Sequence, residues 1–357
     1  MERLLNNSKI IVCVGSGGVG KTTVAAALAV QAAQSGLKVL VLTIDPAKRL
    51  AQTLGIEGSL DVTRVPGQHF KGELFASVID HKKTFDDFVI RASQKSQSIE
   101  KILNNKLYHQ LSTNLSGSQE FTALEKLYTC YESGLYDLII LDTPPTKHAI
   151  DFLQAPQKLA ALFSENVTKW FRDPEGKKSG LFMTLLHSGT KQVLKVLESL
   201  TGNEFIRELG DFFLNIQGWQ DRLYQRTIDV HRLLISNQTR FVLVTSFDQA
   251  KLREADYFAR EIRKGGYHLA AVILNRAFPD WLEAQEGSTK VDGSHLLKVY
   301  EQMKTYYNQR QGLYSTFAAG LPGEVMSLQI PDLMTDISDL KGLEELCALI
   351  KERSPSA

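Results

Sequence analysis

A glycine-rich loop directly after a short apolar run constrains this chain more than any other feature. Residues 15–23 read GSGGVGKTT and follow the apolar run Ile10–Val14. In a strand, loop and helix of this kind, successive backbone N–H groups point at phosphate oxygens at the positive end of the helix. The match to GxxxxGK[ST] therefore predicts a nucleoside triphosphate site, with a β-strand before the loop and an α-helix from Lys21.

The residues of this loop have separate expected tasks. The glycines let the backbone approach the phosphates closely, Lys21 would reach the β- and γ-phosphates, and the Thr22 hydroxyl would hold Mg²⁺. Lys21 is therefore expected to act in catalysis as well as in binding. The predicted phosphate-binding residues are Gly15, Ser16, Gly17, Gly18, Val19, Gly20, Lys21, Thr22 and Thr23.

Composition narrows the class of protein. With 357 residues, 43% of them hydrophobic, the chain can bury a large core as one large or two closely joined domains. A net charge of +1 and the lack of a long basic run argue against nucleic acid as the main partner. Three widely spaced cysteines favour reduced thiols, and no stretch resembles a signal peptide or an integral membrane segment. We expect a cytoplasmic protein.

Apolar runs bounded by turn residues recur along the chain, with helical stretches between most of them. This alternation predicts an α/β fold, a doubly wound and mostly parallel sheet of the P-loop NTPase type. The expected strands are Ile10–Val14, Val39–Ile44, Leu74–Ile79, Leu138–Leu141, Phe241–Thr245 and Ala270–Leu274.

One long segment interrupts the alternation. Residues 151–238 carry apolar positions at helical spacing, including Leu223, Thr227, Val230 and Leu234, and no convincing strand. We therefore expect an ATPase core formed by residues 1–150 and 239–357 and a helical insertion subdomain at 151–238. Residues 84–130 are also mainly helical and are expected to contribute to this insertion.

Two aspartates end predicted strands. Asp45 follows the run that ends at Ile44, where it could position a water in line with the γ-phosphate. It could instead cap a helix, because Pro46 suits a first helical turn. Asp142 ends the run Leu138–Leu141, the Walker B pattern whose carboxylate holds Mg²⁺ directly or through water.

These motifs together resemble one family. The spelling GGVGKT is similar to the deviant P-loop of the class that contains the ArsA arsenite-pump ATPase, the tail-anchored-protein targeting ATPases, MinD and ParA. Asp45-Pro46-Ala47 resembles switch I of the ArsA and targeting ATPases, and residues 142–156, DTPPTKHAIDFLQAP, resemble their switch II. The resemblance covers nearly the whole chain. It implies a dimer that uses ATP or ADP and Mg²⁺, with Asp45 as the catalytic residue and Asp248, Asn275 and Pro331 as further nucleotide-binding residues.

The chain also departs from this family at informative positions. Ser16 stands where the class has a signature lysine that crosses the dimer interface, and Lys147 replaces the glycine of switch II. No CxxC pair is present, so no zinc is expected. None of the three cysteines lies within 151–238, so a three-thiolate arsenite site cannot form there.

The leading interpretation is an ATP-hydrolysing dimeric switch, a homodimer or a heterodimer with a paralogous ATPase that supplies the missing lysine. The insertion could form an apolar groove for a hydrophobic helix client or membrane-protein partner, or it could be the packed interior of a helical subdomain. A second interpretation is a nucleotide-gated scaffold subunit with weak turnover. A third is a positioning ATPase of the MinD or ParA kind, against which the long insertion and the near-neutral charge argue.

Overall fold

The structure is a computed structural model with two units. It describes residues 1–44, 49–56, 61–66, 70–92, 96–105, 108–109, 118–143, 153, 220–283, 294–333 and 336–354. Unit 1 comprises Met1–Ile79, Leu127–Phe152 and Arg232–Ala357, and unit 2 comprises Asp80–Lys126 and Leu153–His231. The insertion boundaries at 151 and 238 stay a prediction, because most of that segment lies outside the described residues.

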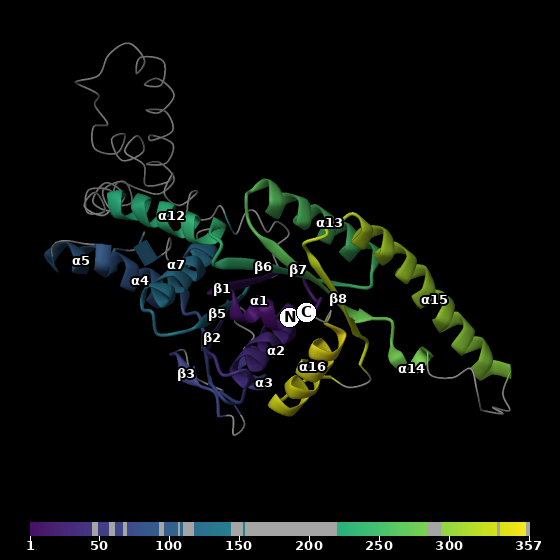
Figure 1. Cartoon of the computed structure of the whole chain (residues 1–357). Helices are drawn as coiled ribbons and strands as arrows, with labels where there is room; N and C mark the ends of the chain where they lie inside the picture. Colours follow the sequence, from purple (N-terminus) through teal and green to yellow (C-terminus); the bar gives the residue numbers. More distant parts are fainter. Residues whose placement is uncertain are drawn as a thin grey trace, which may run out of the picture. The chain divides into compact units, whose positions relative to one another are not determined.

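An eight-stranded sheet runs through unit 1 (Figure 1). Every neighbouring pair is parallel except β3 and β4. The predicted α/β class with a mostly parallel sheet is confirmed, and all six predicted strands are present. In sheet order the strands are β3 (Thr63–Arg64), β4 (Glu73–Val78), β2 (Lys38–Thr43), β5 (Leu138–Asp142), β1 (Ile10–Val14), β6 (Thr239–Ser246), β7 (Leu269–Ala277) and β8 (Met326–Pro331).

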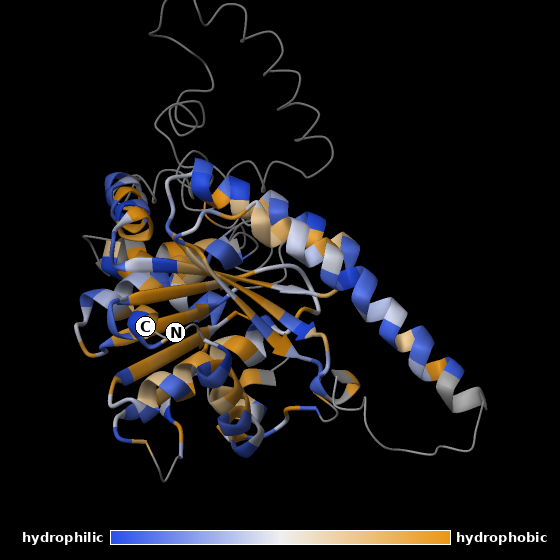
Figure 2. Cartoon of the chain, turned by 45° about the vertical axis from the view of Figure 1, so that its right-hand side comes forward, coloured by the Kyte–Doolittle hydropathy of each residue, from blue (hydrophilic) through white to orange (hydrophobic). Residues whose placement is uncertain are grey.

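Helices cover both faces of this sheet. Ile273 and Leu274 are neighbours on β7, and their side chains join two different buried clusters because successive strand residues point to opposite faces. Ile273 packs with α1 (Glu2–Asn6), α2 (Lys21–Gln34), α3 (Arg49–Thr53) and α16 (Leu340–Arg353). Leu274 belongs to a cluster with residues of α15 (Ser294–Ala319) and α13 (Gln249–Lys264). The short α14 (Asp280–Glu283) follows β7 in the chain. Figure 2 shows the central strands as almost uniformly hydrophobic, as burial on two faces requires.

Helix α2 leads away from the glycine-rich loop and is buried on nearly all sides. Every residue from Val24 to Ala33 is buried. The helix must end at a defined residue for the chain to enter the sheet again. The helix stops before Gly36, which has a φ of +103°. The N–H of Gly36 donates to the carbonyl of Ala33, and the N–H of Leu37 donates to the carbonyl of Ala32. These two bonds form a Schellman motif, and β2 begins directly afterwards at Lys38.

Unit 2 is helical where the structure describes it. It contains α4 (His81–Ala92), α5 (Ser96–Leu103) and the beginnings of α7 (Ser118–Glu132) and α12 (Gln220–Ile235). The rings of Phe85, Phe88, Tyr108 and Phe121 pack together between these helices. Among the described helices of the chain, none combines the length and the apolarity needed to traverse a bilayer.

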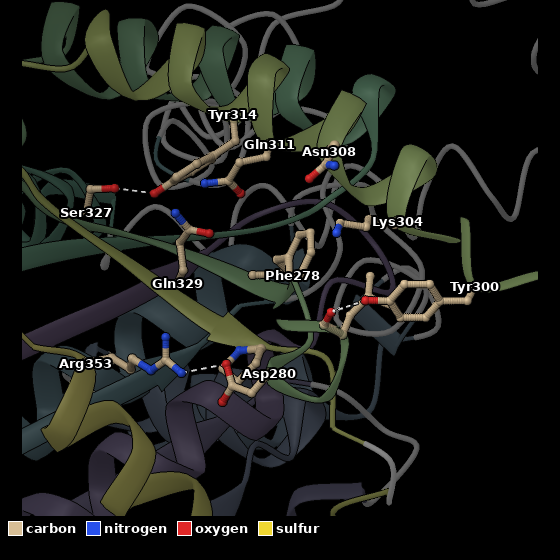
Figure 3. A pocket seen from close by; sticks show the side chains of 13 residues that line it. Phe278, Asp280, Tyr300, Lys304, Asn308, Gln311, Tyr314, Ser327, Gln329 and Arg353 are labelled. Atoms are coloured by element: carbon tan, nitrogen blue, oxygen red, sulfur yellow. Dashed lines mark hydrogen bonds and ion pairs between the residues drawn. The ribbon is translucent and has the colours of Figure 1, made fainter. Parts of the chain in front are cut away.

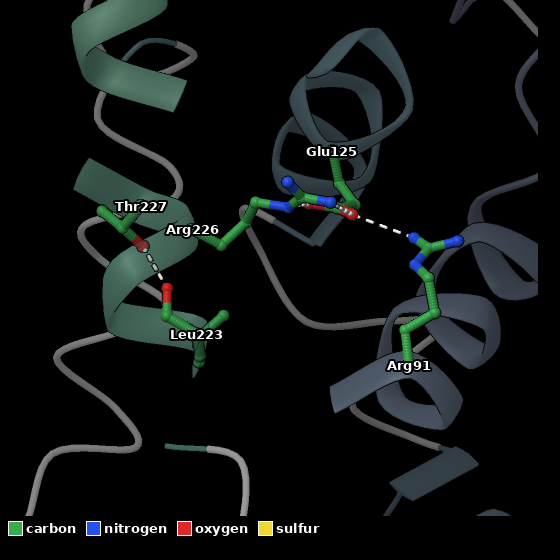
Figure 4. Close-up of polar contacts among 5 residues, drawn as sticks. All are labelled: Arg91, Glu125, Leu223, Arg226 and Thr227. Carbon is green, nitrogen blue, oxygen red and sulfur yellow. Dashed lines mark hydrogen bonds and ion pairs between the residues drawn. The ribbon is translucent and has the colours of Figure 1, made fainter. Parts of the chain in front are cut away.

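A buried carboxylate joins three of the unit 2 helices. The side chain of Glu125 on α7 is 0% exposed and accepts hydrogen bonds from Arg226 on α12 and Arg91 on α4 (Figure 4). The closest N–O distances are 2.8 Å to Arg226 and 2.9 Å to Arg91. Because removal of one partner leaves buried charge without compensation, this triad fixes how α4, α7 and α12 pack.

We predict that Glu125→Gln lowers the free energy of unfolding by about 3 kcal/mol, since two guanidinium groups would lose the buried carboxylate that they share. Urea denaturation followed by circular dichroism measures this. Glu254→Gln is the matched control, because Glu254 pairs with Lys251 on an exposed face of α13 and its loss should cost less than about 0.5 kcal/mol. Equal effects of the two variants would contradict the structural role of Glu125.

Candidate functional site

The glycine-rich loop is held closely by its neighbours in unit 1. A Cβ atom at Gly15 would lie 2.1 Å from the carbonyl oxygen of Val244 on β6. One at Gly20 would lie 2.3 Å from Nδ2 of Asn275 at the end of β7, and Gly20 has a φ of +86°. At Gly15 the neighbour is backbone, so glycine is required by space there. At Gly20 a side chain would displace the end of the Asn275 side chain, and the positive φ adds to the cost of any other residue.

Lys21 begins α2 but its side chain turns back over the loop. The side chain is buried, and Nζ donates a 2.8 Å hydrogen bond to the carbonyl oxygen of Ser16. The ammonium group therefore lies inside the ring formed by the loop, where an anion would meet it. Ser16 is itself buried, and its side chain is a short hydroxyl rather than the long ammonium side chain of a lysine.

A second part of the site is a carboxylate at the meeting point of three strands. Asp142 ends β5, is 1% exposed, and pairs in register with Cys13 of β1 and Thr43 of β2. Its Oδ2 atom accepts hydrogen bonds from the hydroxyls of Thr22, at 2.7 Å, and Thr43, at 2.9 Å. This network fixes the carboxylate beside the first turn of α2.

The exit from β5 is tied to β1 as well. The hydroxyl of Thr143 donates to the carbonyl of Cys13 at 2.8 Å. Burial, and secondarily the Asp142 carboxylate, raise the pKa of the Cys13 thiol, so it remains protonated at neutral pH. Cys13, Cys130 and Cys347 are all buried thiols rather than disulfides. Cys13 thus acts as packing beneath the loop and not as a nucleophile.

A cleft of about 970 Å³ opens beside these residues. The glycine-rich loop and α2 supply one wall, and the ends of β7 and β8 supply another. Asn275 is held against the loop because its Nδ2 atom donates to the carbonyl of Val19 at 2.9 Å. The cleft is lined by Gly18, Gly20, Lys21, Thr22, Thr23, Ala26, Leu50, Gln52, Thr53, Thr143, Asn275, Arg276, Pro331, Asp332, Leu333, Asp336, Ile337, Ser338 and Leu346.

Most of the predicted site residues that the structure describes meet at this cleft. Lys21, Thr22, Asn275 and Pro331 line it together, and Asp142 is bonded to Thr22. Asp248 does not line it: its Oδ1 atom accepts from the N–H groups of Ala250 and Lys251 and caps α13. Asp45, Pro46, Ala47 and Lys147 lie outside the described residues, as do the insertion residues 154–219.

Several residues of the cleft were missed by sequence reasoning. Arg276 has a φ of +56°, the one left-handed conformation at a non-glycine residue in the described part of the chain. Such a backbone is costly and is typical of functional sites. Asp332 and Asp336 enter from the segment after β8. Neither aspartate was assigned a role from the sequence, because both are far along the chain from the glycine-rich loop, although Asp332 directly follows the predicted Pro331.

A second cavity, of about 730 Å³, lies along the same edge of the sheet (Figure 3). Residues of α15 and β8 line it, and Pro331 lines both cavities. On its opposite side Arg353 of α16 donates a 2.6 Å hydrogen bond to Asp280. The two cavities are therefore neighbours in unit 1 that share one residue at the end of β8.

We predict that Gly20→Ala weakens ATP binding more than tenfold relative to Gly18→Ala, because both positions have positive φ but only Gly20 faces Asn275. Nothing lies within 4 Å of a Cβ atom at Gly18, which makes it the matched control. Titration calorimetry with ATP and Mg²⁺ compares the two variants. Equal affinities would show that Asn275 does not constrain the loop.

Comparison with known proteins finds relatives that match nearly the whole length of the chain. The family described as "Anion-transporting ATPase" matches residues 8–321. A protein of Aquifex aeolicus provisionally named arsenical pump-driving ATPase 1 is 27% identical over 97% of this chain and 80% of its own length. The ATPase GET3 of Zygosaccharomyces rouxii is 26% identical over 89% of this chain and 85% of its own. An ATPase ASNA1 homolog of Paramecium tetraurelia is 22% identical over 98% and 96%.

The family match and the geometry agree, since the matched region contains the glycine-rich loop, the Asp142 network and the end of β7 that lines the cleft. The predicted resemblance is confirmed: this chain is a P-loop ATPase and belongs to the ArsA family of anion-transporting ATPases.

Proposed function

We propose that this chain is a dimeric molecular switch in which ATP binding and hydrolysis rearrange a helical subdomain that holds a client or partner. The observation that carries the proposal is the joining of Lys21, Thr22 and Asp142 beside one cleft. A cation inside a loop of backbone N–H groups suits the triphosphate, and a hydroxyl bonded to a carboxylate suits a hydrated Mg²⁺. Membership of an ATPase family supports the same reaction.

The residues present fit Mg²⁺ by their chemistry. A buried carboxylate held by two hydroxyls provides the hard oxygen ligands that this ion prefers. Thr22 would hold the ion, and Asp142 would hold it directly or through water. When bound, Mg²⁺ neutralises charge on the phosphates. Lys21 orients the β- and γ-phosphates, and Asp45 is proposed to orient the attacking water.

Nucleotide selection is assigned to the wall formed by the ends of β7 and β8. Asn275 and Pro331 are proposed to contact the adenine, since both line the cleft. The described bonds of Asp248 are those of a helix cap, so its proposed part in nucleotide binding is indirect. Its resemblance to a nucleotide-side residue of the family keeps it among the proposed binding residues.

The dimer is proposed to be completed by a partner that bears the signature lysine. Ser16 is buried, and its side chain is too short to reach across an interface as a lysine would. A homodimer would have to operate without that charge, whereas a paralogous subunit could supply it in trans. The second candidate is a nucleotide-gated scaffold subunit with weak turnover, and the short side chain of Ser16 favours it over a fast self-sufficient enzyme.

The client side of the proposal concerns the helical insertion. A hydrophobic helix of a membrane protein is the proposed client, and the cytoplasm is the proposed location, in keeping with three buried thiols. Residues 154–219, which make up most of the predicted insertion, lie outside the described residues. The described helices of unit 2 that are proposed to take part in client binding are α4, α5 and the beginnings of α7 and α12.

The first test is ATP turnover by the purified chain with Mg²⁺ across a wide range of protein concentration. We expect turnover per chain to rise with concentration, or on addition of a lysine-bearing paralogue, because two subunits close on the nucleotide. Lys21→Ala should abolish triphosphate binding, and Asp45→Asn should bind ATP without hydrolysing it. Loss of binding in the Asp45 variant would assign that residue a structural role, and a wild-type chain without ATP binding would contradict the whole proposal.

The position of Ser16 gives a second test. We predict that Ser16→Lys raises the turnover of the chain alone at least about tenfold, since a charge supplied across an interface stabilises the transferring phosphoryl group. Ser16→Ala is the control and should not raise turnover. If Ser16→Lys turns over ATP no faster than the wild type, the missing lysine is not what limits catalysis.

A further inference from the structure

Three tyrosines on α15 repeat at an interval of seven residues. Tyr300, Tyr307 and Tyr314 therefore lie on one side of the helix, because seven residues complete about two turns. Each hydroxyl bonds to a different segment of unit 1. Tyr300 donates to the carbonyl of Leu282 at 3.0 Å, Tyr307 donates to Oδ2 of Asp332 at 3.2 Å, and Tyr314 bonds to the hydroxyl of Ser327 on β8. Figure 3 shows the first and the last of these contacts.

The middle tyrosine is the one whose partner lines the nucleotide cleft. Neither Leu282 nor Ser327 lines that cleft, and both line the second cavity instead. Asp332 lies in the cleft wall directly after Pro331, the proposed adenine contact. The hydroxyl of Tyr307 thus connects a long helix outside the cleft to the wall that is proposed to select the base.

The ring of Tyr307 is held independently of this bond. It packs against Phe247, which follows β6, and against Phe278, which follows β7, with ring centroids 6.1 and 5.7 Å apart. Burial and the neighbouring Asp332 carboxylate raise the pKa of Tyr307, so its hydroxyl stays protonated and is the donor. The aromatic contacts fix the ring, and the ring directs the hydroxyl.

Asp332 is also fixed from its backbone. Its N–H donates to the carbonyl of Ala277 at the end of β7, at 3.2 Å. The backbone bond alone leaves the carboxylate able to rotate, and the Tyr307 hydroxyl selects one orientation. The segment after β8 is therefore held at two points, one on the sheet and one on α15.

We propose that Tyr307 is a positioning residue for nucleotide binding: by holding Asp332, it orders the Pro331 segment that contacts the base. This inference rests on the proposed function and adds a residue to it. The bond acts on the base end of the nucleotide and not on the phosphate loop. Its loss must therefore weaken the binding of ATP while leaving the binding of a bare triphosphate unchanged.

The test compares Tyr307→Phe with Tyr314→Phe in the full chain. Both changes remove one hydroxyl from α15 and keep the ring, but only the first breaks a bond to the cleft wall. The probes are ATP and inorganic tripolyphosphate, each with Mg²⁺, titrated by calorimetry. We expect Tyr307→Phe to weaken ATP binding about three- to tenfold and to leave tripolyphosphate binding and kcat within about twofold. Tyr314→Phe should change none of these.

A double-variant cycle shows whether Tyr307 acts through Asp332. In an Asp332→Ala background, Tyr307→Phe should have no further effect on ATP affinity, because the acceptor is already absent. Additive losses, or equal losses for ATP and tripolyphosphate, would overturn the positioning role. Unchanged ATP affinity in Tyr307→Phe would overturn this inference alone, whereas a wild-type chain that binds neither probe would overturn the proposed function with it. Asp332→Ala with Tyr307 intact provides the comparison if Tyr307→Phe does not fold.

Discussion

The site depends on one buried carboxylate at the meeting point of three parallel strands. Asp142 ends β5 between β1 and β2, and its Oδ2 atom accepts from Thr22 and Thr43. Because a buried charge is costly unless it is hydrogen-bonded, the strand ends and the first turn of α2 must stay in register around it. The phosphate loop, which lies between β1 and α2, therefore takes its position from Asp142 as much as from its own glycines.

The central part of the fold could be predicted because its strands are buried on both faces. Such strands read as continuous apolar runs, and Ile10–Val14 and Leu138–Asp142 are clear examples. The two outermost strands were missed for the opposite reason. Thr63–Arg64 has only two residues, and Met326–Pro331 alternates apolar and polar side chains at the edge of the sheet. Neither strand contains the continuous apolar run that burial on both faces produces.

The site also has a part that could be predicted from the sequence and a part that could not. Lys21, Thr22 and Asp142 could be predicted because each lies in a short motif of consecutive residues. Arg276 and Asp332 enter the cleft from β7 and from the segment after β8, and only the three-dimensional order of the strands brings them there. Resemblance to a family suggested Asn275 and Pro331, which both line the cleft. The bond between Tyr307 and Asp332 depends on how α15 packs in three dimensions.

The packing of α16 on α2 has a consequence for how the chain is made. The thiol of Cys347 on α16 donates to the carbonyl of Ala27 on α2, across a separation of 320 residues. Helix α2, apolar on nearly every side, emerges from the ribosome long before α16 exists to cover it. Contacts between such distant segments form late and slow folding. During synthesis the phosphate loop is therefore followed by an apolar helix whose cover is made last, so the nucleotide site is completed only when nearly the whole chain is present.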